Sequence, residues 1–307
     1  MPEDTGLDLV TGAFSYTGRA IAARLLESGR RVRTLTGHPE RPDPFGGEVE
    51  AAPYAFDEPG RMVRFLDGVT TLYNTYWVRF ERGGTTFGEA VRNSRTLFET
   101  AGTAGVRRIV HVSITKPDVA APLPYFRGKA QVERDLAAVG VPHSIVRPTV
   151  VFGRGDVLVN NMAWLLRRFP VFAIPGAGDY RVRPVHIDDV ARLCVEAAAG
   201  EDGSSMDAVG PETFTFHDWV AMVRDAVGAR AWLVHVPPAL VPAATWGIGA
   251  ALRDVLLTRE ELAGLMAELI VTDGPTTGQV AFSDWLGVHA AALGREWASE
   301  VGRHFDR

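Results

Sequence analysis

The stretch that decides the fold is Leu9-Val10-Thr11-Gly12-Ala13-Phe14-Ser15-Tyr16-Thr17-Gly18, near the start of a 307-residue chain. The apolar run 8–10 predicts a strand, and residues 19–28 carry apolar side chains one turn apart, which predicts a helix. A strand that passes through a glycine turn into a helix points backbone N–H groups at an anion, and dinucleotides commonly place their pyrophosphate there. The stretch therefore predicts a nucleotide-binding turn.

Strand-like and helix-like segments go on alternating as far as Arg147. This alternation predicts a parallel sheet with helices on both faces, and ligands bind at the carboxyl ends of such strands. We expect an α/β fold of the Rossmann type, with a doubly wound parallel sheet. The expected strands are 31–36, 49–56, 69–75, 108–113 and 144–147, and the expected helices are 58–66, 88–104 and 125–139.

The pattern changes after Pro148, where segments become less regular and richer in Pro, Gly and Trp. We expect residues 1–150 to form a dinucleotide-binding domain to which residues 184–200 return. Residues 151–183 and 201–307 would form a smaller, mostly helical substrate lobe. Thr258 and Glu261 fit a capping box at a helix start, and Ser283 is a candidate cap for a last helix that ends near Phe305.

Composition restricts the class of protein. A net charge of −5 leaves no basic footprint for nucleic acid. The single cysteine, Cys194, excludes an intramolecular disulfide, and the acidic first residues lack the pattern of a signal peptide, so we expect a cytoplasmic protein. The apolar stretch 234–257 is interrupted by prolines and charges, so we expect no membrane span. It would pack over a pocket or another subunit, and a homodimer is one interpretation.

A second motif, Tyr125-Phe126-Arg127-Gly128-Lys129, places a phenol and an ammonium four residues apart, on one helix face. A free tyrosine titrates near ~10, and a neighbouring ammonium stabilises the phenolate and lowers that pKa. Such a pair can move a proton near neutral pH. The alternative is an ordinary surface helix face.

Both motifs resemble those of the short-chain dehydrogenase/reductase superfamily, in which T-G-x-x-G-x-x-G binds the cofactor and Y-x-x-x-K performs acid/base chemistry. Ser15 replaces the central glycine, and its hydroxyl could donate to a phosphate. The segments 147–153, 184–190 and 208–216 are similar to motifs of extended members. Within that group, 73–77 and 123–129 resemble an atypical branch that includes relatives of a respiratory complex I accessory subunit. The resemblance implies cofactor contacts at Gly12, Phe14, Ser15, Tyr16, Thr17, Gly18, Asn74, Thr75, Lys129, Pro148 and Val150.

The end of the expected second strand indicates the cofactor type. NAD enzymes usually carry an acidic residue there, whereas this chain has Thr36, Gly37 and His38. The missing carboxylate favours NADP over NAD, with His38 and Arg41 as phosphate partners or, alternatively, as parts of an exposed loop. Asp57 matches the family's adenine-contacting aspartate, and it also fits a helix N-cap.

The family's third catalytic member is a Ser or Thr after the fifth strand. In His111-Val112-Ser113-Ile114-Thr115 the aligned position is Ile114, so Ser113 or Thr115 would have to supply the hydroxyl. The bulky Tyr76 and Trp77 would either shape a pocket or pack as plain core. A metal site at His186, Asp188 and Asp189 is disfavoured against a strand end followed by a helix cap, so we expect no metal.

The resemblance implies an NAD(P)-dependent oxidoreductase or epimerase, which exchanges a hydride with an alcohol or ketone carbon while Tyr125 moves the proton. Its substrate would be a small molecule. The alternative is a catalytically silent NAD(P)-binding sensor or assembly subunit, which Ile114 favours. A nucleotide-sugar substrate would need a diphosphate clamp, for which the chain offers a set of arginines that could equally be structural: Arg154, Arg167, Arg168, Arg181 and Arg183.

Overall fold

A computed structural model describes residues 6–118 and 122–304, and these residues divide into two compact units. The first unit contains the chain up to Pro148 together with Ile187–Ala208, and the second contains Thr149–His186 and the chain from Val209 onward.

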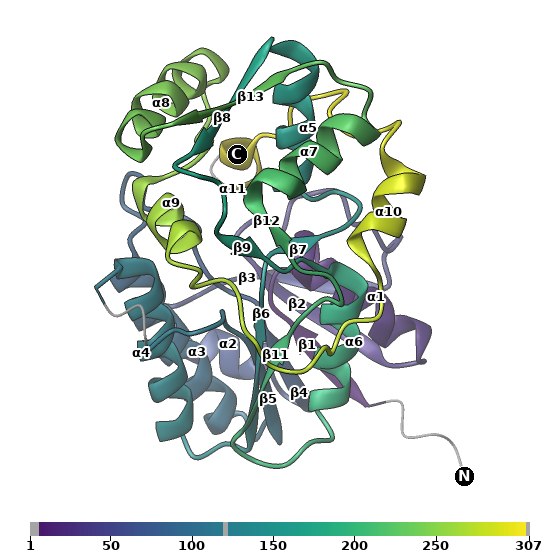
Figure 1. Ribbon diagram of the computed structural model, residues 1–307. Helices are drawn as coiled ribbons and strands as arrows, with labels where there is room; N and C mark the ends of the chain where they lie inside the picture. The colour runs from purple at the N-terminus through teal and green to yellow at the C-terminus, as the bar shows by residue number, and fades with distance from the viewer. Residues whose placement is uncertain (1–5, 119–121, 305–307) are drawn as a thin grey trace. The chain divides into compact units, whose positions relative to one another are not determined.

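The first unit is built on a parallel sheet of seven strands in the order β11-β6-β5-β4-β1-β2-β3 (Figure 1). This arrangement confirms the predicted α/β class with a Rossmann-type sheet. The strands are β1 (Leu7–Val10), β2 (Arg31–Thr36), β3 (Val49–Pro53), β4 (Val69–Asn74), β5 (Arg108–Val112), β6 (His143–Pro148) and β11 (Ser204–Ala208).

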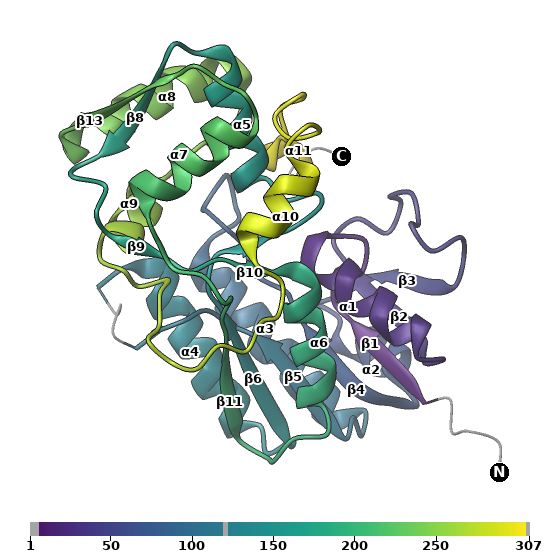
Figure 2. The same ribbon diagram turned by 45° about the vertical axis from the view of Figure 1, so that its right-hand side comes forward.

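Helices cover both faces of this sheet, as Figure 2 shows. Helix α1 packs against α6 on one face, while α3 packs against α2 and α4 on the other. Alternate strand residues such as Leu9, Leu72 and Ile109 are fully buried against the second group. The helices are α1 (Tyr16–Glu27), α2 (Pro59–Phe65), α3 (Phe87–Thr103), α4 (Pro124–Ala138) and α6 (Ile187–Ala197).

The return of the chain to the sheet differs from the expected boundaries. Residues 185 and 186 form β10, which pairs with β7 in the second unit, and the chain joins the first unit only from Ile187, where α6 begins. Strand β11, assigned from the sequence to the substrate lobe, instead pairs with β6 along its whole length. Its polar sequence, Ser-Ser-Met-Asp-Ala, lacks the alternation of a half-buried strand, because it lies at the sheet edge.

The second unit is mostly helical, with three short strand pairs. A core of aromatic and aliphatic side chains from α5, α7 and α10 holds it together, with Phe152, Trp219 and Phe282 fully buried. The helices are α5 (Leu158–Arg168), α7 (Phe216–Ala226), α8 (Val241–Leu252), α9 (Arg259–Met266), α10 (Phe282–His289) and α11 (Glu300–His304). The pairs are β7 (Val151–Phe152) with β10 (Val185–His186), β8 (Val171–Pro175) with β13 (Trp232–Val236), and β9 (Arg181–Val182) with β12 (Phe214–Thr215).

Two cap predictions had different outcomes. The capping box is confirmed, because the Thr258 side chain accepts from the Glu261 N–H and the Glu261 carboxylate accepts from the Thr258 N–H. Ser283 is not a cap: α10 begins one residue earlier, and the backbone N–H and hydroxyl of Ser283 both donate to Glu212. The last predicted helix is also broken in two, and Phe305 lies outside the described residues.

Candidate functional site

The turn between β1 and α1 is shaped by two glycines. Gly12 adopts a φ of 63°, a conformation that strains other residues, and its N–H donates to the Leu35 carbonyl at 2.8 Å. Gly18 lies so close to the turn that an added Cβ would stand 2.2 Å from the Gly12 carbonyl oxygen. Helix α1 therefore starts directly beneath the strand end, at Tyr16 rather than at the expected Arg19. Tyr16, Thr17 and Gly18 form its first turn. The backbone N–H groups of a first helical turn have no partner within the helix and can bind an anion.

Ser15 is placed differently from its predicted role. Its hydroxyl donates to the Gly12 carbonyl at 2.6 Å, and its N–H donates to the same oxygen at 2.8 Å. A hydroxyl has one proton, so in this arrangement Ser15 stabilises the turn and can only accept from a ligand. Phe14 and Tyr16, on either side of it, are half-buried.

A polar cluster joins the carboxyl ends of β1, β4 and β5. The Thr75 hydroxyl donates to the Thr11 carbonyl at 2.6 Å, and the Thr75 N–H donates to the Thr11 hydroxyl. The buried Asn74 accepts from Thr11 and from the Tyr76 N–H, and it donates to His111 Nδ1 at 3.0 Å. Its Oδ1 and one Nδ2 proton are thus used by the protein, so a cofactor contact by Asn74, which stays a prediction, would have to use the second Nδ2 proton.

His111 was not singled out as a site residue from the sequence. Since Nδ1 accepts from Asn74, Nε2 carries the proton, and in the described part of the chain that buried N–H has no partner. Burial, together with the nearby Lys129 charge, holds the pKa of His111 well below its usual value. A neutral imidazole is therefore fixed at the end of β5.

The loop after β2 contains a carboxylate that the strand end itself lacks. The Thr36 hydroxyl accepts from the His38 N–H at 3.2 Å, and His38 Nδ1 lies 3.4 Å from Glu40 Oε1. His38 and Arg41 are half-exposed, so both could reach a ligand. Asp57 is exposed and is not a helix cap, because the N-cap of α2 is Glu58, which makes no side-chain cap bond.

Tyr125 opens α4 within a group of aromatic rings. Its ring meets Trp77 and Phe87 edge-on, with centroid distances of 5.9 and 5.7 Å, and Trp77 stacks on Phe87 at 6.0 Å. The half-buried Tyr125 ring is therefore held by apolar contacts. Trp77 also packs closely against α4 at Gly128, where an added Cβ would stand 2.8 Å from the indole.

Lys129 lies on the same helix as expected, but in a more buried place. Its ammonium donates to the Val112 carbonyl at 3.1 Å and lies 4.8 Å from the Trp77 ring centroid. Burial lowers the pKa of Lys129 from 10.5 to about 7, and Glu133 opposes this shift only in part. Glu133 is itself bound by both nitrogens of the Arg147 fork, at 2.6 and 3.0 Å.

The two candidate hydroxyls follow β5. Ser113 is buried directly after the strand end, and its hydroxyl oxygen has no hydrogen-bond partner among residues 6–118 and 122–304. Thr115 is buried too, and Ile114 between them is half-buried. Pro148 ends β6 on the neighbouring strand, and Val150 belongs to the second unit.

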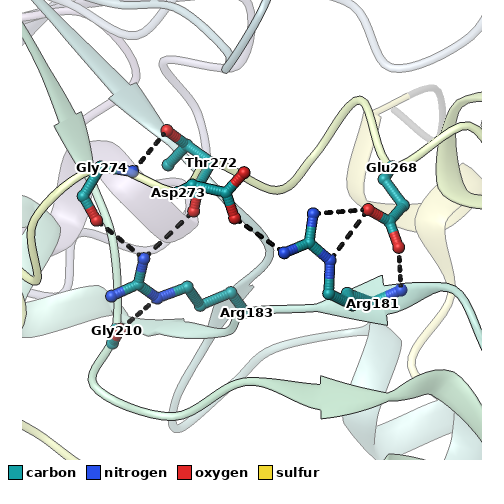
Figure 3. Close-up of polar contacts among 7 residues, drawn as sticks. All are labelled: Arg181, Arg183, Gly210, Glu268, Thr272, Asp273 and Gly274. Atoms are coloured by element: carbon teal, nitrogen blue, oxygen red, sulfur yellow. Dashed lines mark hydrogen bonds and ion pairs between the residues drawn. The ribbon is translucent and has the colours of Figure 1, made fainter.

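The arginines considered for a diphosphate clamp are largely occupied. Figure 3 shows the Arg181 fork on Glu268 and Asp273, and the Arg183 fork on the carbonyls of Gly210, Thr272 and Gly274. The other pair, Arg167 and Arg168, donates to carbonyls of residues 290–295. Only Arg154, of the five, is exposed without a polar contact in the described part of the chain. The structural interpretation therefore holds for four of them.

Residues 186–189, the disfavoured metal site, form a strand end followed by the first turn of a helix. Asp188 and Asp189 lie in the first turn of α6, where carboxylates favour the helix dipole, and Asp189 pairs with Arg192 at 3.3 Å. His186 packs edge-on against Phe152. In the described residues no group of three or more His, Cys, Asp or Glu side chains could hold a metal ion.

Comparison with known proteins identifies the family and the kind of fold. The model of the family described as "NAD dependent epimerase/dehydratase family" matches residues 9–208. The chain is 28% identical to the (4-alkanoyl-5-oxo-2,5-dihydrofuran-3-yl)methyl phosphate reductase of Streptomyces griseus, over 94% of this chain and 99% of that protein.

Two further similarities extend this result. The chain is 24% identical to NADH dehydrogenase (ubiquinone) 1 alpha subcomplex subunit 9 of Arabidopsis thaliana, over 74% of this chain and 59% of that longer protein. The dTDP-glucose 4,6-dehydratase DesIV of Streptomyces venezuelae, solved with NAD bound, superposes with a TM-score of 0.67 at 20% identity, over 92% of this chain and 95% of DesIV. Such low identity to a solved structure shows the fold alone.

Proposed function

The chain belongs to the NAD-dependent epimerase/dehydratase family, and we propose on that premise that it is an NAD(P)-dependent oxidoreductase or epimerase with Tyr125 as its acid/base. One observation carries this proposal. The Gly12–Gly18 turn, Ser113 and Tyr125 all follow carboxyl ends of strands in one parallel sheet, where ligands of such sheets bind. The reductase relative from Streptomyces supports the oxidoreductase class.

The turn fits a dinucleotide pyrophosphate. Gly18 lets the first helical turn approach the strand end, and Ser15 uses its proton on the protein, so the anion would be held by N–H groups. The dinucleotide, when bound, supplies or accepts a hydride at its nicotinamide.

Ser113 after β5 and Tyr125 on α4 would bind the substrate oxygen and exchange a proton with it. During reduction, the Tyr125 hydroxyl donates its proton to the developing alkoxide, and during oxidation the phenolate takes the proton back. Ser113 is suited to hold that oxygen, because its buried hydroxyl needs a partner. Lys129, with a pKa of about 7, carries a positive charge for part of the time at neutral pH and favours the phenolate when it does.

A preference for NADP over NAD belongs to this proposal. The support is the strand end Thr36-Gly37-His38, which has no carboxylate, and the half-exposed His38 and Arg41 beside it. Glu40 next to His38 opposes a 2′-phosphate, so the preference should be modest.

The substrate class follows from the arginines. A nucleotide sugar brings a diphosphate that needs cationic partners. Arg167, Arg168, Arg181 and Arg183 are bound to the chain itself, and the Tyr125 ring is surrounded by aromatic side chains. We therefore favour a carbonyl or alcohol substrate without a diphosphate.

A second candidate function is a catalytically silent nucleotide-binding subunit. It is favoured by Ile114 at the aligned catalytic position and by Lys129, whose ammonium is engaged by Val112 and Trp77. The Arabidopsis relative, which is named as a subunit of NADH dehydrogenase, agrees with this alternative.

The deciding experiment compares wild type with Tyr125→Phe. Calorimetry with NADPH and NADH measures binding, and a panel of ketones, aldehydes and nucleotide sugars measures turnover. Tyr125→Phe should bind the cofactor normally and lose ~10²–10⁴-fold in rate, as expected for a missing acid/base.

The matched control is Tyr180→Phe in the second unit. The Tyr180 ring is buried in the core of the second unit and stacks on Phe216, so removal of its hydroxyl should change neither binding nor rate. Near-normal turnover by Tyr125→Phe would exclude the mechanism. Tight binding by a wild type that turns over nothing on the panel would favour the silent alternative.

A further inference from the structure

The second unit exposes a set of large apolar side chains, here called the apolar patch: Val171, Trp232, Val234, Leu240 and Trp246. Trp232 and Trp246 are each 76% exposed, and Leu240 is 60% exposed. Val171 and Trp232 are register partners on the paired strands β8 and β13, and helix α8, which carries Trp246, lies beside these strands in both Figure 1 and Figure 2. Single exposed apolar residues need no explanation, but several large ones on neighbouring elements indicate an interaction surface.

Helix α8 is unusual because it has no polar face. Its sequence from Val241 to Leu252 contains no charged residue, and among its described residues only Val241 and Gly249 are buried. A helix that is apolar all round is normally covered on every side. No helix in the described part of the chain is long and apolar enough to cross a membrane.

The segment that carries most of the patch has a charge of the opposite sign to that of the whole chain. Between residues 226 and 258 the arginines Arg230 and Arg253 are exposed, while Arg259 beyond them is followed by Glu260 and Glu261. Asp254 is the one acidic residue of that stretch, and it is buried, accepting from Trp297 Nε1 and from the N–H groups of Glu300 and Val301. A chain with a net charge of −5 therefore carries a net positive charge along this segment.

We propose that this face attaches the protein to an anionic lipid surface, with α8 lying in the interface. Exposed tryptophans suit the headgroup level, where an apolar ring and a polar N–H are both accommodated. Arginines beside the apolar face match negatively charged headgroups. A second copy of the chain fits less well, because a two-fold interface through this patch would bring two positively charged segments together.

Vesicle flotation of the full chain tests the proposal. The probes are vesicles of phosphatidylcholine alone and of phosphatidylcholine with increasing phosphatidylglycerol. The protein should float with anionic vesicles, release as salt rises, and stay unbound with neutral ones. Tryptophan emission should shift to the blue on binding.

Two charge-introducing variants locate the surface. Trp246→Glu and Trp232→Glu should each weaken vesicle binding by about tenfold or more. Each variant replaces an apolar ring that enters the lipid interface with a negative charge that the anionic headgroups repel. The control is Val288→Glu on α10, a residue 78% exposed outside the patch, which should bind vesicles like wild type. All three side chains are exposed, so thermal unfolding should be unchanged. Arg230→Gln should weaken binding and reduce its dependence on salt.

Several results would overturn the proposal. One is no flotation at any phosphatidylglycerol content, and another is equal loss in Val288→Glu. Light scattering that shows a dimer broken by Trp246→Glu would assign the patch to a second copy instead. None of these outcomes depends on cofactor binding or turnover, so the lipid proposal and the proposed function can fail separately.

Discussion

The glycine turn and the Tyr125–Lys129 pair both come from short motifs, yet the contacts that complete them differ. In the turn, the decisive contacts are local: Gly18 against the Gly12 carbonyl, and Ser15 on the same oxygen. In the pair, Lys129 depends on Trp77 and Val112, which come from other parts of the chain. When a motif is completed by local contacts, the spacing of its residues predicts its geometry. When it is completed by distant residues, the spacing predicts only which residues are candidates.

The largest effect is expected from filling the space at Gly18. Gly18→Ala would place a Cβ 2.2 Å from the Gly12 carbonyl oxygen, so strand and helix must separate. We expect nucleotide affinity to fall by more than ~100-fold and the free energy of unfolding to fall by about 1–3 kcal/mol. Calorimetry and chemical denaturation measure the two effects.

The matched control for that change is Gly60→Ala in α2. A Cβ at Gly60 meets nothing within 4 Å, so alanine should bind nucleotide normally and raise the free energy of unfolding by roughly 0.5–1 kcal/mol. If both alanine variants behave alike, close packing at the turn is not what the site requires.

The next effect concerns the buried ammonium. The pKa of Lys129 is about 7 in the folded protein against 10.5 when unfolded, so below pH 7 folding must bury a charge. Between pH 7 and 10.5 Lys129 is protonated mainly in the unfolded state, so the cost of folding shrinks as the pH rises through this interval. Lys129→Met should therefore raise the free energy of unfolding by a few kcal/mol at pH 6, and by much less near pH 10.

Urea denaturation at pH 6 and near pH 10 measures that difference. The chain contains only one other lysine, Lys116, so Lys116→Met is the natural control and should leave the pH dependence unchanged. A gain from Lys129→Met that is equal at both pH values would contradict a lowered pKa.

The smallest effect is expected at the loop after β2. NADP should bind more tightly than NAD by only ~10–100-fold, because one charge-assisted contact contributes about 1.5–3 kcal/mol. Glu40→Gln, which removes the carboxylate beside His38, should widen this preference, and competition calorimetry reports it. Clearly tighter binding of NAD by the wild-type protein would reverse the assignment.

Sequence periodicity predicted most of the first unit, and Arg31–Thr36 coincides with β2 at both ends. Strands with buried faces carry apolar residues at regular intervals, so their pattern is visible. The seventh strand was missed because an edge strand of Ser and Asp lacks that pattern. The arginines could be found but not interpreted, since the sequence does not tell whether a guanidinium faces a ligand or the chain's own carbonyls.

The sequence by itself determined the alternating α/β order, the close turn at Gly12 and Gly18, and the helix face shared by Tyr125 and Lys129, because each depends on neighbours a few residues away. Only the tertiary structure decided that Asn74 bonds to His111, that four arginines are occupied, and that Lys129 is buried beside Trp77. Hydrogen-bond partners and desolvation depend on residues brought together from distant positions, and no local pattern records them.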